Sequence, residues 1–408
     1  MPASLHTASS SLADHDADSL ARHLDAATGC GVARGKRAAE RAFRHAFAND
    51  ASGGARWSDG ALAEAGIGAW ARPTLVALSP RIGLTVHDRA PSSDGTVRLL
   101  LQAQDGGLIE SVIIPAEEGR DALRTTLCLS SQVGCARACR FCETGDHGLT
   151  RHLTPGEIVD QYRLVQRICS DPDRPMDARV DAPRPLPPAD RPGHRRRAAE
   201  RPVSNIVFMG MGEPFDNLEA VLRSVELLTD PHAFGFAPTR ITVSTVGVAD
   251  KLTTFFAGTR AELAISLNAP DDARRDHIMP INRRFDLAAL RDALLAAMPA
   301  GRRVLFQYAL FDGFNDSLAD AELLADYVAP VRCRVNVIPA NPGPDPSLVA
   351  PPPERVDAFV AHLRARGVTA LVRRPRGRDI GGACGQLAGR ARLVTLRSPG
   401  DRSPQASS

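Results

Sequence analysis

The sequence predicts an α/β protein whose largest domain is a parallel sheet of six strand–helix units, curved into a partial barrel. The first observation is that short apolar runs alternate with amphipathic stretches from Thr125 onward. The second is that the hydrophobic period changes ahead of that residue, from helical spacing to the alternation of strands. The predicted strands are 125–129, 206–209, 240–244, 262–267, 304–310 and 334–338. The predicted helices lie near 155–168, 218–228, 287–298, 319–328 and 355–366. On such a scaffold, functional side chains collect at the carboxyl ends of the strands.

Two smaller modules precede the barrel. Apolar residues at helical spacing over 21–70 predict a small helical module, and the alternation over 82–115, with a turn at Asp94-Gly95, predicts two or three strands. Residues 171–202 are dominated by Pro, Arg and Asp and are expected to form a disordered surface insertion, with RNA contact as the alternative. The predicted divisions are a disordered N-terminus (1–18), a helical accessory module (19–80), a β-extension (81–124), the barrel (125–390) and a C-terminal tail (391–408).

The composition is that of a globular protein without a membrane span. The 408 residues are 43% hydrophobic and 24% charged, and no run of 18 apolar residues occurs. Residues 1–18 lack the basic and apolar regions of a signal peptide, so a cytoplasmic location is expected. The net charge of +3 leaves the partner open. Arginines cluster at 195–197, 302–303 and 373–378, where they are either phosphate-binding groups or ordinary solvated surface.

Eight cysteines in a cytosolic protein indicate metal or redox chemistry. Cys135, Cys139 and Cys142 have the spacing CxxxCxxC directly after the first predicted strand. Three thiolates on one tight loop can hold three corners of a 4Fe–4S cluster and leave the fourth iron for the amino and carboxylate groups of S-adenosylmethionine (SAM). The alternative is a structural zinc, which needs four closed ligands and would have to recruit Cys128 from the strand. The spacing, with Phe141 before the last cysteine, resembles that of the radical SAM superfamily.

Two further segments point to the same site. The sequence MGMGEP at 209–214 ends the second predicted strand; its glycines would admit a ligand close to the backbone, and Glu213 could accept a hydrogen bond from the SAM amino group. Taken alone, this segment could be a simple turn. Cys384 lies between glycines in a loop that follows the last apolar run, 368–372, and is expected above the cluster. The alternative is an incidental cysteine in a tight turn.

From about Gly35 to Gly389 the chain resembles the radical SAM methylases that methylate adenosine in ribosomal RNA. The resemblance depends on several separated motifs acting together. They are SDGT at 93–96, ESVIIP at 110–115, CLSSQVGC at 128–135, GMGEP at 210–214, ST at 244–245, ISLNAP at 265–270, MPIN at 279–282, IPANP at 338–342 and ACGQL at 383–387.

The resemblance implies a two-step mechanism that consumes two SAM molecules per turnover. Adenine C2 and C8 are not nucleophilic, so one SAM first methylates Cys384 by polar transfer to its thiolate. The reduced cluster then cleaves a second SAM to a 5′-deoxyadenosyl radical, which removes hydrogen from the S-methyl group, and the resulting carbon radical adds to the base. Glu110 accepts the ring proton. Cys128 attacks the sulfur and leaves a transient Cys128–Cys384 disulfide, which an external electron donor must reduce.

The resemblance also assigns the SAM contacts and exposes departures. The contacts fall on residues near predicted strand ends: Gly212, Glu213, Ser244, Ser266, Leu267, Asn268 and Asn341. Without the resemblance, Glu110 in an alternating strand would be merely an exposed charge. The family usually has His where this chain has Asn268, which hydrogen-bonds but does not titrate. The helical module diverges over 35–70, which leaves the particular RNA open.

We therefore expect a monomeric methyltransferase that places a methyl group on C2 of an adenine in 23S ribosomal RNA, with tRNA as a further substrate. The target base must be unstacked to reach the cluster. One alternative is methylation at C8, as in the antibiotic-resistance relatives. Another is a radical SAM enzyme that abstracts hydrogen from a non-RNA substrate, which would need neither Cys128 nor Cys384. A non-catalytic RNA-binding protein is disfavoured by the intact three-cysteine loop.

Overall fold

The protein is described by a computed structural model covering residues 12, 15, 17–48, 58–78, 82–115, 125–170, 203–231 and 233–388. Several predicted segments lie outside these residues. They are most of the N-terminus 1–18, the insertion 171–202 with its arginines 195–197, and the tail 391–408.

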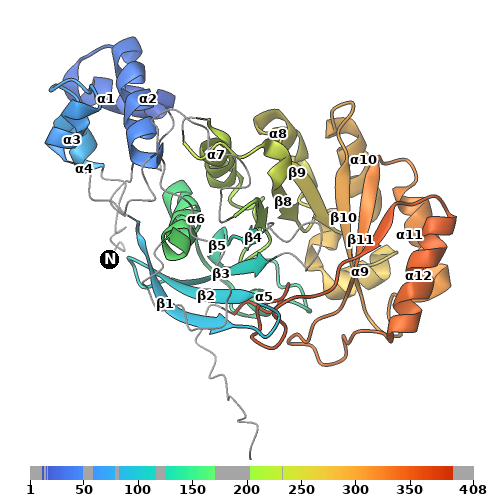
Figure 1. Ribbon diagram of the computed structural model, residues 1–408. Helices are drawn as coiled ribbons and strands as arrows, with labels where there is room; N and C mark the ends of the chain where they lie inside the picture. Colours follow the sequence, from blue (N-terminus) through green and yellow to red (C-terminus); the bar gives the residue numbers. More distant parts are fainter. Residues whose placement is uncertain are drawn as a thin grey trace, which may run out of the picture.

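One curved sheet of ten strands forms the centre of the molecule (Figure 1). Its order is β1-β2-β3-β4-β7-β8-β9-β10-β11-β12, and the strands from β4 onward are parallel. These parallel strands are β4 (Thr125–Cys128), β7 (Asn205–Phe208), β8 (Ile241–Thr245), β9 (Glu262–Ser266), β10 (Val304–Leu310), β11 (Cys333–Pro339) and β12 (Ala370–Val372). The predicted partial barrel of six strand–helix units is confirmed, and β12 adds a short seventh parallel strand at its edge.

Helices cover the outer face of the parallel strands (Figure 1). They are α6 (Pro155–Ser170), α7 (Leu218–Thr229), α8 (Leu252–Gly258), α10 (Leu287–Ala297), α11 (Leu318–Val328) and α12 (Pro353–Ala365). The short helix α9 (Asp272–Ile278) instead lies beyond the carboxyl end of β9, where its Ile278 carbonyl accepts a hydrogen bond from the Arg140 amide of the cysteine loop. Side-chain caps fix several of their first turns: Asp286 accepts a hydrogen bond from the Ala289 amide, and Ser317 and Asp320 form a capping box at α11. Strands such as β10 carry large buried side chains, including Phe306 and Tyr308, which lie on the same face of the strand and pack into the main core.

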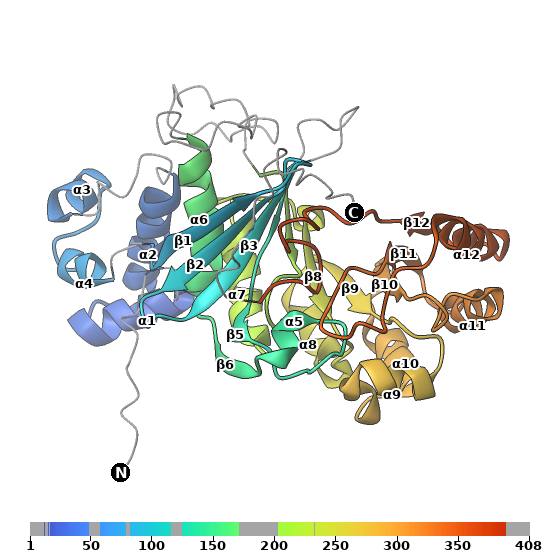
Figure 2. The ribbon, with the colours of Figure 1, turned by 90° about the horizontal axis from the view of Figure 1, so that it is seen from below.

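Three antiparallel strands extend the sheet beyond β4. They are β1 (Leu84–Pro91), β2 (Val97–Ala103) and β3 (Leu108–Pro115), and β3 pairs directly with β4, so the extension and the barrel share one sheet. The predicted turn at Asp94-Gly95 joins β1 to β2. A small hairpin, β5 (Gln132–Gly134) with β6 (Leu149–His152), and the one-turn helix α5 (Glu143–Asp146) surround the cysteine loop. Figure 2 shows the segment after β12 returning toward β3 and α5.

The four N-terminal helices lie at one end of the sheet (Figure 1), and their buried apolar side chains belong to the same core cluster as those of the barrel. They are α1 (Ala17–Thr28), α2 (Val32–Ala48), α3 (Asp59–Glu64) and α4 (Arg72–Ala77). Leu20, Leu24, Ala39 and Leu75 are fully buried among them. The Arg223 guanidinium of α7 lies over the ring of Phe43, which joins this module to the barrel. No helix among the described residues is long and apolar enough to cross a membrane.

Candidate active site

A cavity of about 160 Å³ lies at the carboxyl ends of the parallel strands, where this scaffold places its functional groups. Its walls come from the cysteine loop, the glycine-rich segment after β7, the ends of β8 to β11 and the C-terminal loop. The predicted site residues that line it are Cys135, Cys139, Cys142, Gly212, Glu213, Ser244, Ser266, Asn268, Asn341 and Cys384. The side chain of Leu267 is instead buried in the main core, so the structure does not bring it into the cavity.

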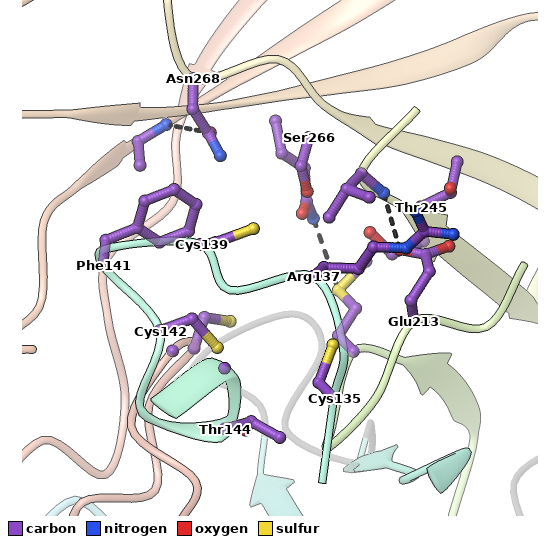
Figure 3. A pocket seen from close by; sticks show the side chains of 18 of the residues that line it. Cys135, Arg137, Cys139, Phe141, Cys142, Thr144, Glu213, Thr245, Ser266 and Asn268 are labelled. Carbon is purple, nitrogen blue, oxygen red and sulfur yellow. Dashed lines mark hydrogen bonds between the residues drawn. The ribbon is translucent and has the colours of Figure 1, made fainter. Parts of the chain in front are cut away.

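The cysteine loop presents three thiols to the cavity. Figure 3 shows the sulfur atoms of Cys135, Cys139 and Cys142 pointing into the same space. Backbone hydrogen bonds hold the loop: the Cys135 amide donates to Gly148 (2.9 Å) and the Cys142 amide to Cys139 (3.0 Å). Burial raises the pKa of all three thiols, and raises that of Cys135 to about 12. A metal displaces the proton of a thiol that it binds, so the raised pKa values do not prevent these thiols from acting as metal ligands.

Glu213 is fixed at the floor of the cavity by backbone donors. Its carboxylate accepts hydrogen bonds from the amides of Phe215 and Val246, both at 2.9 Å, and its own amide donates to Gln132 Oε1 at 2.8 Å. Burial raises the pKa of Glu213 to about 7, although the hydrogen bonds from Thr245, Val246 and Phe215 oppose that rise. A carboxylate oxygen has further acceptor capacity, so Glu213 can still receive a donor from a ligand.

Gly212 is a glycine because the protein itself approaches its backbone. Its φ is +101°, and a Cβ atom there would lie 2.6 Å from the Cβ of Gln132. The glycine was expected to make room for a ligand. It makes room for Gln132, whose side chain in turn fixes the Glu213 amide.

Asn268 adopts a left-handed backbone conformation, with φ of +58°, at the end of β9. Its Oδ1 accepts a hydrogen bond from the Ala309 amide (2.9 Å), and its carbonyl accepts one from Asn315 Nδ2 (2.8 Å). Asparagine tolerates this conformation better than most residues. Asn268 therefore ties β9 to β10 without any need for a titratable group.

The variant Asn268→Ala is expected to lower the free energy of unfolding by about 2 kcal/mol, because it loses a buried hydrogen bond and places a Cβ-bearing residue without a polar side chain in the left-handed region. Asn268→Gly should recover about 1 kcal/mol of that loss, since glycine removes only the conformational cost. Urea unfolding of the two variants and the parent chain checks both values. Equal losses in Ala and Gly would contradict the role given to the backbone conformation.

Cys384 lies on the C-terminal loop, between two cavities. It is exposed, and it lines both the large cavity and a second cavity of about 70 Å³. Asn341 Nδ2 donates to the Cys384 carbonyl (3.0 Å), while Asn341 Oδ1 is buried and accepts no hydrogen bond from any residue that the structure describes. A buried amide oxygen without a donor marks a place for a ligand donor.

Cys128 and a group of arginines line the second cavity. Arg373, Arg374 and Arg376 stand at its wall, with Cys128 and Cys384. Burial, followed by the nearby Cys384, raises the pKa of Cys128 to about 12, and the charge of Arg373 opposes that rise. Cys128 and Cys384 thus line the same cavity, although Cys128 is absent from the wall of the large cavity, and their exchange of a disulfide stays a prediction.

Comparisons with known proteins agree with this geometry. The sequence model of the Radical SAM superfamily matches residues 129–324. The chain is 57% identical over 386 residues (94% of this chain, 88% of the relative) to a probable RNA methyltransferase of Sorangium cellulosum (strain So ce56). It is 43% identical over 322 residues (78% of each) to the dual-specificity RNA methyltransferase RlmN of Anaeromyxobacter sp. (strain Fw109-5).

The chain belongs to the RlmN-type family of radical SAM RNA methyltransferases. A solved structure of a radical SAM methyltransferase from Sphaerobacter thermophilus matches with a TM-score of 0.73 and 36% identity, covering 93% of this chain and 100% of the other. Membership makes the chain an enzyme of this kind and implies a 4Fe–4S cluster and SAM as its cofactors.

The cavity fits both cofactors of an RlmN-type enzyme. Three thiols face one space, and the unpaired Asn341 Oδ1 and the carboxylate of Glu213 offer acceptors to a ligand ammonium group. The zinc alternative would require Cys128 as the fourth ligand, and Cys128 faces the other cavity. Within the described part of the chain, no three His, Cys, Asp or Glu side chains converge as ligands of one metal ion would.

Glu110 is not an exposed charge in this RlmN-type chain, and it lines neither cavity. It is fully buried: one carboxylate oxygen accepts a hydrogen bond from Arg98 Nη1 (2.6 Å) and the other from the Ala388 amide (3.0 Å). Arg98 and Glu110 are diagonal neighbours across β2 and β3, since Arg98 faces Val112 in the register. The structure thus joins Glu110 to the loop that carries Cys384, and its assignment as proton acceptor stays a prediction.

Sequence reasoning missed several residues of the site. Gln132 fixes Glu213, and Thr144 Oγ1 donates to the Leu387 carbonyl at 2.6 Å. Arg137, on the cavity wall, forms an ion pair with Asp216. Gln132 and Arg137 lie within or beside the cysteine motifs, and this position was the only signal in the sequence that they belong to the site. Their partners are far away in the sequence and could not be inferred from spacing.

Proposed function

We propose that this enzyme methylates C2 of an adenine in 23S ribosomal RNA, with tRNA as a second substrate, through a methyl group carried on Cys384. The observation that carries the proposal is the place of Cys384 between two cavities, one with the cluster cysteines and one with Cys128 and arginines. Relatives named dual-specificity RNA methyltransferases support an RNA substrate. The activity further requires an external electron donor, and we expect a monomer that acts in the cytoplasm.

The three cysteines of the loop would hold the cluster, while Gly212, Glu213, Ser244, Ser266, Asn268 and Asn341 would contact SAM. With two SAM molecules per turnover, these cofactors would supply first a methyl group and then the radical chemistry that removes hydrogen from it. The thiol of Cys384 is exposed and reaches the large cavity, where it can take up the methyl group. The same thiol also reaches the second cavity, where it can present that group to a base.

Cys128 would release the finished base. Its thiolate attacks the sulfur of Cys384, forms the S–S bond and breaks the S–C bond, whose electron pair stays with carbon and takes a proton to complete the methyl group. At neutral pH the buried Cys128 is a protonated thiol, since its pKa is about 12. It must therefore lose a proton before it attacks, and Arg373 is the cation that favours the thiolate.

We expect RNA to bind over the second cavity. Arg374 is exposed there and makes no hydrogen bond or ion pair with any described residue, so its guanidinium is available to a phosphate. Arg374→Ala is expected to weaken RNA binding and to reduce the slope of log K against log salt by about one. A salt titration of RNA affinity measures both. Arg260→Ala, an exposed arginine just before β9 at the opposite end of the sheet, is the control, and an equal effect there would refute the site.

SAM binding should depend on the ionisation of Glu213. Because the pKa of Glu213 is about 7, the carboxyl group is neutral below that pH and loses its attraction for the SAM ammonium group. The dissociation constant of SAM is therefore expected to rise by up to about tenfold per unit as pH falls below about 7. Calorimetric titration of the cluster-loaded enzyme between about pH 8 and about pH 6 measures this, and Glu213→Gln should remove the dependence. A pH dependence that persists in Glu213→Gln would assign it to another group.

Nucleoside mass spectrometry tests the proposed reaction. The reconstituted enzyme is incubated without oxygen with SAM, a reductant, and either ribosomal RNA or tRNA. New 2-methyladenosine in each RNA is the expected result. New 8-methyladenosine would show that the enzyme methylates C8 and not C2. Formation of 5′-deoxyadenosine without a methylated base would refute the RNA assignment for this chain.

A further inference from the structure

We propose that the turn between β1 and β2, residues 92–96, is a clamp that positions the loop carrying Cys384, with Asp94 and Asp379 as its positioning residues. The inference rests on the proposed role of Cys384, because the value of a clamp lies in fixing that thiol between its two cavities. The turn carries the SDGT motif of 93–96, which the cofactor and substrate assignments leave without a role.

The first arm of the clamp is Asp94. Its Oδ2 accepts hydrogen bonds from Arg376 Nε (3.0 Å) and from the Gly377 amide (2.8 Å), and Arg376 also donates to the Asp94 carbonyl. Hydrogen bonds from Thr96, the Gly377 amide and Ser92 outweigh the effect of burial, so the pKa of Asp94 lies well below its usual range. Asp94 is consequently ionised at any pH at which the enzyme works, and the charge-assisted bonds persist.

The second arm runs in the opposite direction. Asp379, on the C-terminal loop, accepts hydrogen bonds from Ser92 Oγ (2.6 Å) and from the Ser93 amide (3.2 Å). Each segment therefore contributes one carboxylate to the other. The two segments are 287 residues apart at Ser92 and Asp379, so these contacts serve the tertiary position of the loop and not its local conformation.

The fit between the turn and the loop is close. Gly377 has a φ of +67°, and a Cβ atom there would lie 2.8 Å from Cγ2 of Thr96, which is fully buried. Only glycine suits both the backbone conformation and the contact. The turn and the loop are thus in close van der Waals contact, in addition to the hydrogen bonds of Asp94 and Asp379.

Cys384 lies between this clamp and a second anchor. Upstream, the Gly382 amide donates to the Gly377 carbonyl (2.8 Å), which connects the clamp to the segment just before the thiol. Downstream, the Gly385 carbonyl accepts from the Glu143 amide (2.8 Å), beside the cysteine loop. Release of the upstream end should let Cys384 move relative to Cys128, while the downstream anchor keeps the loop attached to the protein.

The test is the redox equilibrium of the Cys128–Cys384 pair in the full-length, cluster-loaded enzyme, without RNA or SAM. The pair is equilibrated without oxygen in glutathione buffers of known ratio, and mass spectrometry measures the fraction of enzyme that contains the disulfide. That fraction gives the effective concentration of the Cys384 thiol relative to the Cys128 thiol. Asp94→Asn and Asp379→Asn should each lower that concentration by about tenfold, the size expected when a hydrogen bond to a charged group is lost. Hydrogen exchange of 377–388 should become faster in both variants.

Asp88→Asn is the matched control, because Asp88 lies on β1 of the same hairpin and its carboxylate has no hydrogen bond or ion pair among the described residues. An effective concentration and an exchange rate equal to the parent's in both arm variants would overturn the clamp. If Asp94→Asn lowers the melting temperature more than the control does, the same measurements on Ser92→Ala decide between a clamp and a general loss of stability, since this variant removes only one hydroxyl. RNA methylation is measured separately: its absence in the parent enzyme would refute the proposed function and leave the clamp result standing.

Discussion

Replacing Cys384 by alanine is expected to abolish RNA methylation while the reductive cleavage of SAM continues. Cys384 is exposed, its hydrogen bond with Asn341 is made by its backbone carbonyl, and the bond to the Glu143 amide is made by the neighbouring Gly385 carbonyl, so alanine retains both. The variant should therefore fold and keep its cluster. It loses the atom that carries the methyl group, and removal of a covalent nucleophile costs at least about 10⁴-fold in rate.

Two assays on the same preparation separate the outcomes. Nucleoside mass spectrometry follows the methylated base, and chromatography follows 5′-deoxyadenosine. Cys333→Ala is the control, because Cys333 lies at the start of β11, at the opposite end of that strand from the cavity, and should leave both products unchanged. Methylation that persists in Cys384→Ala would exclude a methyl group carried on this residue.

The alternation of apolar segments was sufficient to predict the parallel strands and the longer helices. Strands such as β8 and β10 carry buried apolar side chains at alternating positions, and helices such as α10 have their own N-cap and apolar stripe, so each carries its signal locally. The elements that the sequence did not reveal are short. Hairpin β5–β6 and helices α5 and α9 have few apolar residues, and they are held by contacts with the cysteine loop and its surroundings.

The residues of the site also differ in whether their role has a local signal in the sequence. The three cluster cysteines lie on one loop, so their spacing is a local signal. The contacts of Gln132 with Glu213, and of Asp94 with Arg376, join segments far apart in the chain and leave no pattern in either. Glu110 shows that the alternation of polar and apolar residues along a strand does not always predict which side chains are exposed.

A strand with alternating polar residues normally exposes them, but β3 is covered on both sides. Ser111 Oγ donates to Gln161 of α6 on one side, and the Glu110 carboxylate accepts from the Ala388 amide on the other. The returning C-terminal loop, which covers that second face, comes from the far end of the sequence. The burial of Glu110 could therefore be found only in the folded chain.

Replacing Cys139 by alanine is expected to remove the cluster and, with it, both SAM cleavage and RNA methylation. Cys139 is buried in the middle of the three-cysteine loop, 6% exposed, and no other described cysteine except Cys384 joins the three on the cavity wall. Loss of a partner behind a metal ligand already costs about 10- to 100-fold in metal affinity, so loss of the ligand itself should cost at least about 100-fold.

Iron and sulfide content, visible absorption and 5′-deoxyadenosine formation are measured on Cys139→Ala after anaerobic reconstitution. Cys169→Ala serves as the control, since Cys169 lies near the end of α6 outside both cavities and should retain the cluster. The pattern differs from that of Cys384→Ala, in which iron and 5′-deoxyadenosine remain and only the methylated base disappears. Full iron content in Cys139→Ala, or zinc in place of iron in the parent chain, would exclude the three-cysteine cluster site.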